Sequence, residues 1–503
     1  MRQYTRQVGS PWLAAILLLS ISVSLDAQPV ASTPARGDAE RLVAAMLGDT
    51  PLVRDLQALS DEVGGRATGS PNNLRAVEWG LARFRDAGVS VRREAFTMPS
   101  RWLERSASAT ITAAGGIAFS PRVAAMPFSV ATPRTGTRAA LLDAGSGSEG
   151  DFTRLGSGAA GAFLLVEQAE LADIDGLFKE YDETAAIEVR ARAARAAGVV
   201  YMGSRPNDLL YRHNVAIGAR NTMPMLVMES DGAKRAMRLL RAGKALSLTA
   251  ILDLDVGPAY ESYNVVGEIE GTATPREIVI ISAHLDAWDL GDGALDNGAN
   301  VALVIDLARQ IRRLGIAPAR TIRFALWNGE EQGMNGSFGY VKSHAAELDR
   351  HAMAMSVDIG CGRITGFFTG GRADLPPVVD RALEPVRGLG PFEQLDVPIV
   401  GTDNFDFMLQ GVPNLVANQE PASYGPNYHA RSDTFDKCDG RQLRQNAAIA
   451  AAVVYGFAQE RAALPRHSRA EVEALMQRTD LPKQMRTFNL WDEWEAGARG
   501  RSK

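Results

Sequence analysis

Apolar and charged residues alternate along this chain with two different periods, and each period predicts one kind of element. Residues 37–62 and 73–87 place apolar side chains three and four positions apart, as amphipathic helices do, and Gly88 follows the second segment as a C-terminal cap. Residues 89–98 alternate one by one, as a half-buried strand does. The first part of the chain therefore predicts helices followed by a strand.

After residue 260, short apolar runs alternate with helical segments. An unbroken apolar run is typical of a strand that is buried on both faces of a parallel sheet. The predicted strands are 277–282, 321–327, 352–357 and 414–417, and the predicted helices are 298–314, 336–346 and 442–459. This alternation predicts an α/β fold with a doubly wound, mostly parallel sheet. Such sheets bind ligands beyond the carboxyl ends of their strands.

The pattern changes between residues 121 and 252. Short apolar runs are separated there by glycine-rich turns, and two helical segments lie near 187–197 and 231–241. This pattern predicts a smaller α/β module inserted into the host domain. The predicted organisation is a signal peptide at 1–27, a catalytic domain at 28–120 and 253–465, the insert at 121–252 and a C-terminal tail at 466–503.

The N-terminus has the features of a secretory signal peptide. Arg2 and Arg6 precede an apolar run at 12–25, which is shorter than the roughly 20 residues that span a bilayer, and Ala27 offers a small residue for cleavage. We expect a secreted or periplasmic protein that has no membrane contact after cleavage. An uncleaved N-terminal anchor is the alternative.

The composition of the chain excludes several classes of protein and of metal site. With 46% hydrophobic and 22% charged residues and a net charge of −5, the chain reads as globular, without a basic surface for nucleic acid. Two cysteines are too few for a disulfide scaffold or a thiolate zinc site. Cys361 and Cys438 either form one disulfide or remain two thiols. Because the chain has only six histidines, a metal site must use carboxylates.

Carboxylates and imidazoles follow the predicted strands in a regular order. The set is His284, Asp286, Asp296, Glu330, Glu331, Asp358 and His429. Oxygen and imidazole donors without thiolate suit zinc, cobalt or manganese. Two imidazoles and at least three of the carboxylates would make five ligands. These are too many for one catalytic zinc with an open position, so the set predicts two metals that share a bridging carboxylate. The other histidines, His213, His344, His351 and His467, lack this context and are predicted to be structural or exposed.

The order and gaps of these residues resemble the co-catalytic di-zinc aminopeptidase family, and within it the carboxypeptidase Q type. The matching segments are 284–289 (HLDAWD), 327–333 (WNGEEQG), 429–434 (HARSDT) and 66–70 (RATGS). The insert resembles a protease-associated domain. The resemblance implies a zinc exopeptidase (phosphorylase/hydrolase-like) fold over nearly all of the mature chain. Asn404 departs from the pattern, because many relatives have histidine after Thr402-Asp403, but this removes no ligand.

The resemblance also implies which residues hold two Zn(II) ions. His284 and Asp358 would hold one ion and Glu331 and His429 the other, with Asp296 bridging them.

Catalytic roles are implied in the same way. Glu330 would be the general base for a metal-bridging hydroxide, and Asp286 would support His284. Tyr424 or Tyr428 could donate a hydrogen bond to the oxyanion. Packing is the alternative role for both phenols.

Together these features predict an exported zinc-dependent exopeptidase that hydrolyses short peptides, either an aminopeptidase or a dipeptidase. A glutaminyl cyclase-like acyltransferase with one zinc and a non-catalytic binding domain are the alternatives. The expected partners are a peptide substrate and, by resemblance, a second copy in a homodimer. The insert is expected to cover the cleft and limit substrate length. Side-chain preference is left open.

Overall fold

The computed structural model of the protein describes residues 37–502, except 173, 215–221 and 463. The predicted signal peptide at 1–27 lies outside these residues. The described chain is built around two eight-stranded sheets. Within the described part of the chain, every helix is too short or too polar to cross a membrane.

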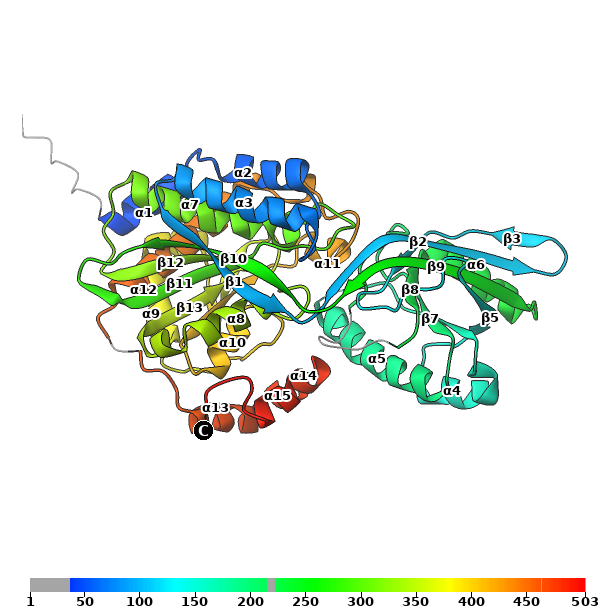
Figure 1. Ribbon diagram of the computed structural model, residues 1–503. Coiled ribbons are helices and arrows are strands. Elements are labelled where there is room, and N and C mark those ends of the chain that lie inside the picture. The colour runs from blue at the N-terminus through cyan, green and yellow to red at the C-terminus, as the bar shows by residue number, and fades with distance from the viewer. Residues whose placement is uncertain (1–36, 173, 215–221, 463, 503) are drawn as a thin grey trace, which may run out of the picture. The chain divides into compact units, whose positions relative to one another are not determined.

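The first sheet is mixed, with its parallel part at the centre (Figure 1). Its central neighbours β12, β11, β13 and β16 run parallel. β1 and β10 pair antiparallel with their neighbours, and β14 pairs antiparallel with β16 and parallel with β15. In spatial order the strands are β1 (Ser90–Met98), β10 (Tyr260–Ile269), β12 (Arg320–Trp327), β11 (Thr274–His284), β13 (His351–Ser356), β16 (Asn414–Gln419), β14 (Ile364–Phe368) and β15 (Glu393–Leu395). This is the α/β class that the sequence predicts.

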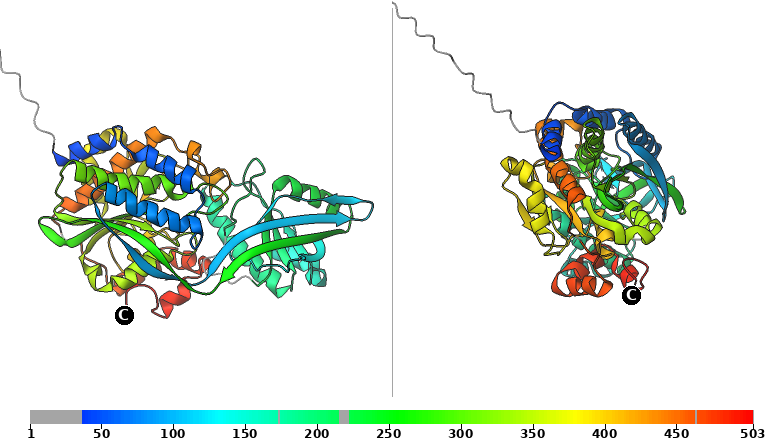
Figure 2. Two further views of the ribbon diagram at one scale, coloured as in Figure 1. Left: turned by 45° about the horizontal axis from the view of Figure 1, so that its top comes forward. Right: turned by 90° about the vertical axis from the view of Figure 1, so that its left-hand side faces the viewer.

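Helices bury both faces of this sheet (Figures 1 and 2). On β11, Val279 and Ile281 belong to the core cluster of one face, and Ile278 and Ile280 belong to that of the other. The first cluster includes α1 (Asp38–Met46), α2 (Leu52–Ala58), α3 (Pro71–Asp86), α7 (Ala299–Arg313), α9 (Pro376–Leu383) and α12 (Gly440–Gln459), and the second includes α8 (Asn335–Ser343) and α10 (Asn404–Leu409). Burial on both faces explains why the central strands are apolar at most positions.

The second sheet lies in residues 101–257, which we call the insert lobe. Its strands in spatial order are β3 (Ile117–Phe119), β2 (Arg101–Ala113), β9 (Leu246–Gly257), β5 (Thr137–Asp143), β6 (Phe163–Val166), β7 (Gly198–Met202), β8 (Met225–Met228) and β4 (Val123–Ala125). Its helices are α4 (Glu149–Leu155), α5 (Ile174–Ala193) and α6 (Ser230–Arg241). The sheet starts before residue 121 because β2 pairs with β9. That this lobe is a protease-associated domain stays a prediction.

The C-terminal tail packs on the catalytic domain. It forms α13 (Arg469–Arg478), α14 (Leu481–Thr487) and α15 (Trp491–Glu495). Leu475, Met485 and Trp494 are buried in one cluster with Phe405 and Met408 of α10. Its helices therefore belong to the folded core, a role that the polar composition of the tail did not indicate.

Cys361 and Cys438 form a disulfide, with their Cα atoms 5.5 Å apart. Of the two alternatives that the sequence left open, the structure has the bonded one. The bond joins the segment after β13 to the segment before α12.

Candidate metal centre

The predicted ligands meet because their strands are neighbours. Parallel pairing sets His284 at the end of β11 opposite Trp327 at the end of β12, and Ser282 opposite Ser356 at the end of β13. The residues that follow the three strands therefore reach the same edge of the sheet. They are Asp286, Glu330, Glu331 and Asp358.

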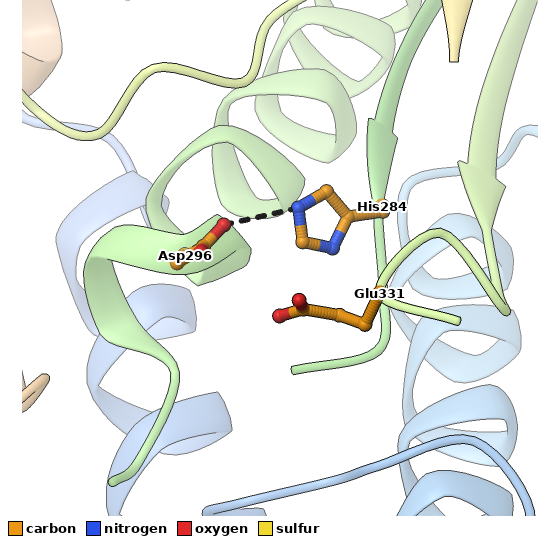
Figure 3. Close-up of side chains that lie close together, drawn as sticks. All are labelled: His284, Asp296 and Glu331. Carbon is orange, nitrogen blue, oxygen red and sulfur yellow. Dashed lines mark hydrogen bonds and ion pairs between the residues drawn. The ribbon is translucent and has the colours of Figure 1, made fainter. Parts of the chain in front are cut away.

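Asp296 lies between two imidazole–carboxylate pairs. Its Oδ1 is 3.1 Å from Nε2 of His284, and its Oδ2 is 3.5 Å from Nε2 of His429. Nε2 of His284 is also 2.9 Å from Oδ1 of Asp358, and Nε2 of His429 is 2.9 Å from Oε2 of Glu331. Figure 3 shows the His284 imidazole pointing at Asp296, with the Glu331 carboxylate nearby. The structure thus brings the five predicted ligands together, two on each side of Asp296.

The donor atoms fit a cation. Ligand atoms of His284, Asp296 and Glu331 lie within 4.8 Å of one another. Asp296 Oδ2 and Glu331 Oε1 are buried without a hydrogen-bond partner among the described residues. A buried carboxylate oxygen without a partner costs free energy, which a cation at this point would offset. Imidazole nitrogens and carboxylate oxygens are ligands that zinc accepts.

Burial sets the protonation of these groups. It raises the pKa of both Glu330 and Glu331 well above the usual value, and neighbouring carboxylates raise it further. Burial lowers the pKa of His429 to about 4, which leaves its imidazole in the neutral form that binds metals. Burial also opposes charge on His284, but Asp358 and Asp296 raise its pKa well above the usual value. Acidic neighbours that favour a proton on His284 also favour a divalent cation in the same place.

Asp286 contacts His284 through its main chain. Its carbonyl oxygen lies 2.9 Å from Nδ1 of His284, whereas its carboxylate Oδ1 lies 3.8 Å away. The other carboxylate oxygen accepts hydrogen bonds from the Thr68 hydroxyl at 2.7 Å and from the Gly329 N–H at 3.0 Å. Asp286 therefore joins three loops at the site. Thr68 carries no local signal of this role, because its partner lies more than two hundred residues further along the chain.

Two further polar residues hold the predicted ligands in place. Asp433 accepts hydrogen bonds from the N–H groups of Leu295 at 2.7 Å and Asp296 at 3.1 Å. Burial raises the pKa of Asp433 to about 7. Asn297 donates to Oδ1 of Asp358 at 2.7 Å. Asp433 lies in the matching segment 429–434, where it was predicted without a role, and Asn297 was not predicted.

Arg66 fixes the glycine-rich loop between His284 and Asp296. Its guanidinium donates to the carbonyl oxygens of Leu285 at 2.5 Å, Asp292 at 2.8 Å and Gly293 at 2.9 Å. Gly293 has φ 63°, and a Cβ there would lie 2.3 Å from that of Ala287. Only glycine fits this close approach.

A cavity of about 310 Å³ opens onto the ligands. Its polar side is formed by Glu330 and the five predicted ligands. Its other lining residues are mostly apolar or aromatic: Leu177, Phe178, Tyr181, Ile359, Phe368, Ile399, Val400, Gly401, Thr402, Tyr424, Tyr428 and Phe488. The Tyr424 hydroxyl donates to the carbonyl oxygen of Asp358 at 3.4 Å, and the Tyr428 and Tyr181 hydroxyls lie 3.3 Å apart. Tyr181 comes from α5 of the insert lobe and was not foreseen.

The remaining histidines and Asn404 do not line the cavity. His213 contacts Gln168, His344 contacts Glu94, and His351 contacts Tyr340. His467 is half-buried, and its main-chain N–H donates to Gly411 O. Asn404 donates to Oδ1 of Asn414 at 3.0 Å and accepts from the Thr402 hydroxyl at 2.5 Å. Each of these side chains has a place in the fold outside the ligand set.

Comparison with known proteins indicates the class of protein to which the chain is similar. Residues 264–454 match the sequence profile of Peptidase family M28. Carboxypeptidase Q of Mus musculus is 28% identical over 82% of this chain and 86% of its own length. "Probable lipoprotein aminopeptidase LpqL" of Mycobacterium tuberculosis is 26% identical over 87% of this chain and 90% of its own.

Solved structures of known peptidases are also similar to this chain. A peptidase M28 precursor from Shewanella amazonensis superposes with a TM-score of 0.76 and 28% identity, covering 86% of this chain and 98% of that one. A zinc aminopeptidase from Bacillus subtilis shares the fold, with a TM-score of 0.65 and 20% identity over 80% of this chain and 93% of that one. The fold and the matches define a metallopeptidase. The chain carries a peptidase family M28 domain and is homologous to carboxypeptidase Q and to M28 aminopeptidases.

Proposed function

We propose that this protein is an exported exopeptidase that binds two zinc ions and hydrolyses short peptides with an apolar side chain next to the scissile bond. The observation that carries the proposal is the position of Asp296. One of its carboxylate oxygens faces His284 and the other faces His429, and each imidazole has a carboxylate of its own. This arrangement offers two adjoining sets of donors that share one bridging group.

The proposed ligands form two zinc positions. His284 and Asp358 would hold one zinc ion, Glu331 and His429 would hold the other, and Asp296 would contact both. When bound, zinc supplies Lewis-acid polarisation of the scissile carbonyl and makes water more acidic.

Glu330 is the proposed general base. It lines the cavity, and its neighbour Glu331 contacts His429. Because burial raises the pKa of Glu330, its carboxylate readily takes a proton from the attacking water and can return it to the leaving amine. Tyr424 and Tyr428 line the same cavity and are candidates to donate to the oxyanion.

The apolar walls favour an apolar substrate side chain. Ile359, Phe368, Ile399 and Val400 line the cavity from the catalytic domain, and Phe178 lines it from the insert lobe. A side chain that enters this space leaves water for an apolar surface, which stabilises the complex. A cavity of about 310 Å³ accommodates one or two residues rather than a long chain.

The test combines metal content with hydrolysis. The chain lacking residues 1–27 is purified, its zinc is counted, and leucyl, phenylalanyl and glycyl anilides are screened beside the corresponding dipeptides. We expect two zinc ions per chain and fastest turnover with leucyl or phenylalanyl substrates. Turnover of anilides indicates an aminopeptidase, and turnover of dipeptides alone indicates a dipeptidase.

Other outcomes would contradict the proposal. One zinc with cyclisation of N-terminal glutamine would identify a cyclase, and no metal with no turnover would identify a binding domain. Export and the homodimer are further parts of the proposal, checked by cell fractionation and by light scattering of the purified protein.

A further inference from the structure

The insert lobe contacts the loop that carries His429. Residues 210–212 of the insert lobe lie antiparallel to residues 429–431, with a bridge between Tyr211 and Ala430. The Arg212 N–H donates to the carbonyl oxygen of His429 at 2.9 Å, and the Arg431 N–H donates to that of Leu210 at 2.9 Å. Two main-chain hydrogen bonds thus attach a catalytic-domain loop to the insert lobe.

A third contact reaches the imidazole of His429. Its Nδ1 lies 3.3 Å from the carbonyl oxygen of Arg212. A carbonyl only accepts hydrogen bonds, so this contact favours the tautomer with its proton on Nδ1. The lone pair is then on Nε2, the atom that faces Asp296 and Glu331. A hydrogen bond of this kind commonly orients a metal-binding histidine.

The Arg212 side chain fixes this carbonyl in place. It is fully buried and binds both oxygens of Asp289, each at 2.8 Å. It also donates to Oε2 of Glu104 at 2.6 Å and to the carbonyl oxygen of Ala125 at 2.9 Å. Asp289 belongs to the loop between His284 and Asp296, and Glu104 belongs to β2. One guanidinium therefore joins the insert lobe to a second loop of the site.

We propose that Arg212 is a positioning residue for His429, so that the insert lobe completes the second metal position as well as bordering the cavity. This inference rests on the proposed two-zinc function. Without the Arg212 side chain, residues 210–212 lose their anchor, and the His429 imidazole gains rotational freedom. The position formed by Glu331 and His429 then binds zinc more weakly, whereas the position formed by His284 and Asp358 keeps its contacts.

The test measures zinc affinity by titrating metal-free protein with zinc in a competing chelator. We compare wild type, Arg212→Met, Arg212→Lys and Arg309→Met. Arg309 is the matched control, because it also binds two carboxylates, those of Asp55 and Asp306 at 2.5 and 2.6 Å, on α2 and α7 away from the site. Arg212→Met should weaken one of the two zinc affinities about 10- to 100-fold and leave the other within a factor of three. The affinity of this zinc position in Arg212→Lys should lie between the affinities in Arg212→Met and wild type, because lysine keeps the charge but not the bidentate contact with Asp289.

Unchanged affinity for both zinc ions in a folded Arg212→Met variant would overturn the inference and leave the proposed function standing. An equal loss in Arg309→Met would also overturn it, because the effect would then be general destabilisation. If Arg212→Met does not fold, Asp289→Asn replaces it, with the same expected selective loss and the same overturning result. If wild type itself binds fewer than two zinc ions, the proposed function fails, and the inference fails with it.

Discussion

The hydroxyl groups of Tyr181 and Tyr428 lie 3.3 Å apart and link α5 of the insert lobe to the residue before His429. The Tyr181 ring also packs against Phe488 of the tail, with ring centroids 4.9 Å apart. Next to this contact, the Thr487 hydroxyl donates to Asp182 at 2.5 Å. One wall of the cavity is therefore formed by two segments that are distant in sequence, and neither belongs to the central sheet.

This wall should control substrate choice. Phe178 lines the cavity but is 44% exposed, so Phe178→Ala removes apolar contact surface at little cost in stability. We expect KM for leucyl and phenylalanyl substrates to rise roughly three- to tenfold, with kcat nearly unchanged. Phe119→Ala, in β3 of the same lobe, is the control. Equal KM values for all three proteins would show that α5 does not contact the substrate.

Glu330→Gln should separate catalysis from metal binding. Glutamine keeps the shape of the side chain but cannot accept the proton of water, so kcat should fall about 10²- to 10⁴-fold. Zinc content should stay at the wild-type level, because Glu330 is not one of the proposed ligands. A variant that loses zinc in parallel with activity would instead make Glu330 a ligand.

Asp296→Asn should disturb both metal positions. The two carboxylate oxygens of Asp296 face different imidazoles, and an amide offers one weak donor oxygen in place of two charged ones. Both zinc affinities should therefore fall, whereas Glu331→Gln should weaken only one. Zinc titration of the two variants side by side gives the comparison. Retention of one wild-type affinity in Asp296→Asn would exclude a bridging role.

The disulfide should contribute substantially to stability. Cys361 and Cys438 are 77 residues apart, and a cross-link over a loop of that length restricts the unfolded chain by roughly 2–5 kcal/mol. The double variant Cys361→Ala/Cys438→Ala should show this loss in denaturant unfolding of the metal-free protein. Treatment of wild type with reductant should give the same shift, and an unchanged midpoint in both experiments would contradict the expectation.

His351 should make the fold sensitive to acid. Burial lowers the pKa of this histidine from 6.5 to about 4, and its Nε2 lies 3.0 Å from the Tyr340 hydroxyl. The unfolded chain binds this proton more readily than the folded chain does. The contribution of neutral His351 to stability is therefore fully present above pH 6.5 and is lost as the pH falls toward 4. The loss amounts to about 3 kcal/mol. In His351→Gln, the unfolding temperature should depend less on pH between pH 6.5 and 4 than in wild type. An unchanged pH dependence in this variant would show that protonation of His351 does not cause the loss of stability.

The parts of the fold that could be predicted from sequence are those that local pattern determines. Strands β11, β12, β13 and β16 read as apolar runs because helices cover both of their faces. Strand β10 was missed because Ser262 and Asn264 are buried within it. Asn264 is satisfied by the N–H of Asn328 and the carbonyl of Gly336, two distant partners that a sequence window does not contain.

Helix α5 was also predicted only in part from the sequence. The sequence predicted a helix near 187–197, but α5 runs from Ile174 to Ala193. Its Leu177 and Tyr181 line the cavity, whereas Ile187 and Ala191 pack against the second sheet, so its apolar residues do not follow one stripe.

The proposed ligands were predictable because four of them end a strand, follow a strand or precede a helix, and His429 lies in a segment that resembles the family. The groups that orient them were not. Thr68 and Arg212 lie in other parts of the chain and reach the site only through tertiary contacts. Thr68 lies in the matching segment 66–70 but has no local signal of its partner, and nothing in the local sequence of Arg212 distinguishes it from an ordinary loop residue.

The insert lobe leaves and rejoins the catalytic domain at paired positions. Strands β1 and β10 are antiparallel neighbours, and Met98 at the end of β1 lies opposite Tyr260 at the start of β10. In the catalytic sheet alone, these strands would be the two arms of a simple hairpin. A segment of any length that begins and ends at this hairpin tip preserves the strand register on both sides. The same tip is thus the natural point at which to exchange this lobe for another, and with it the wall that faces the substrate.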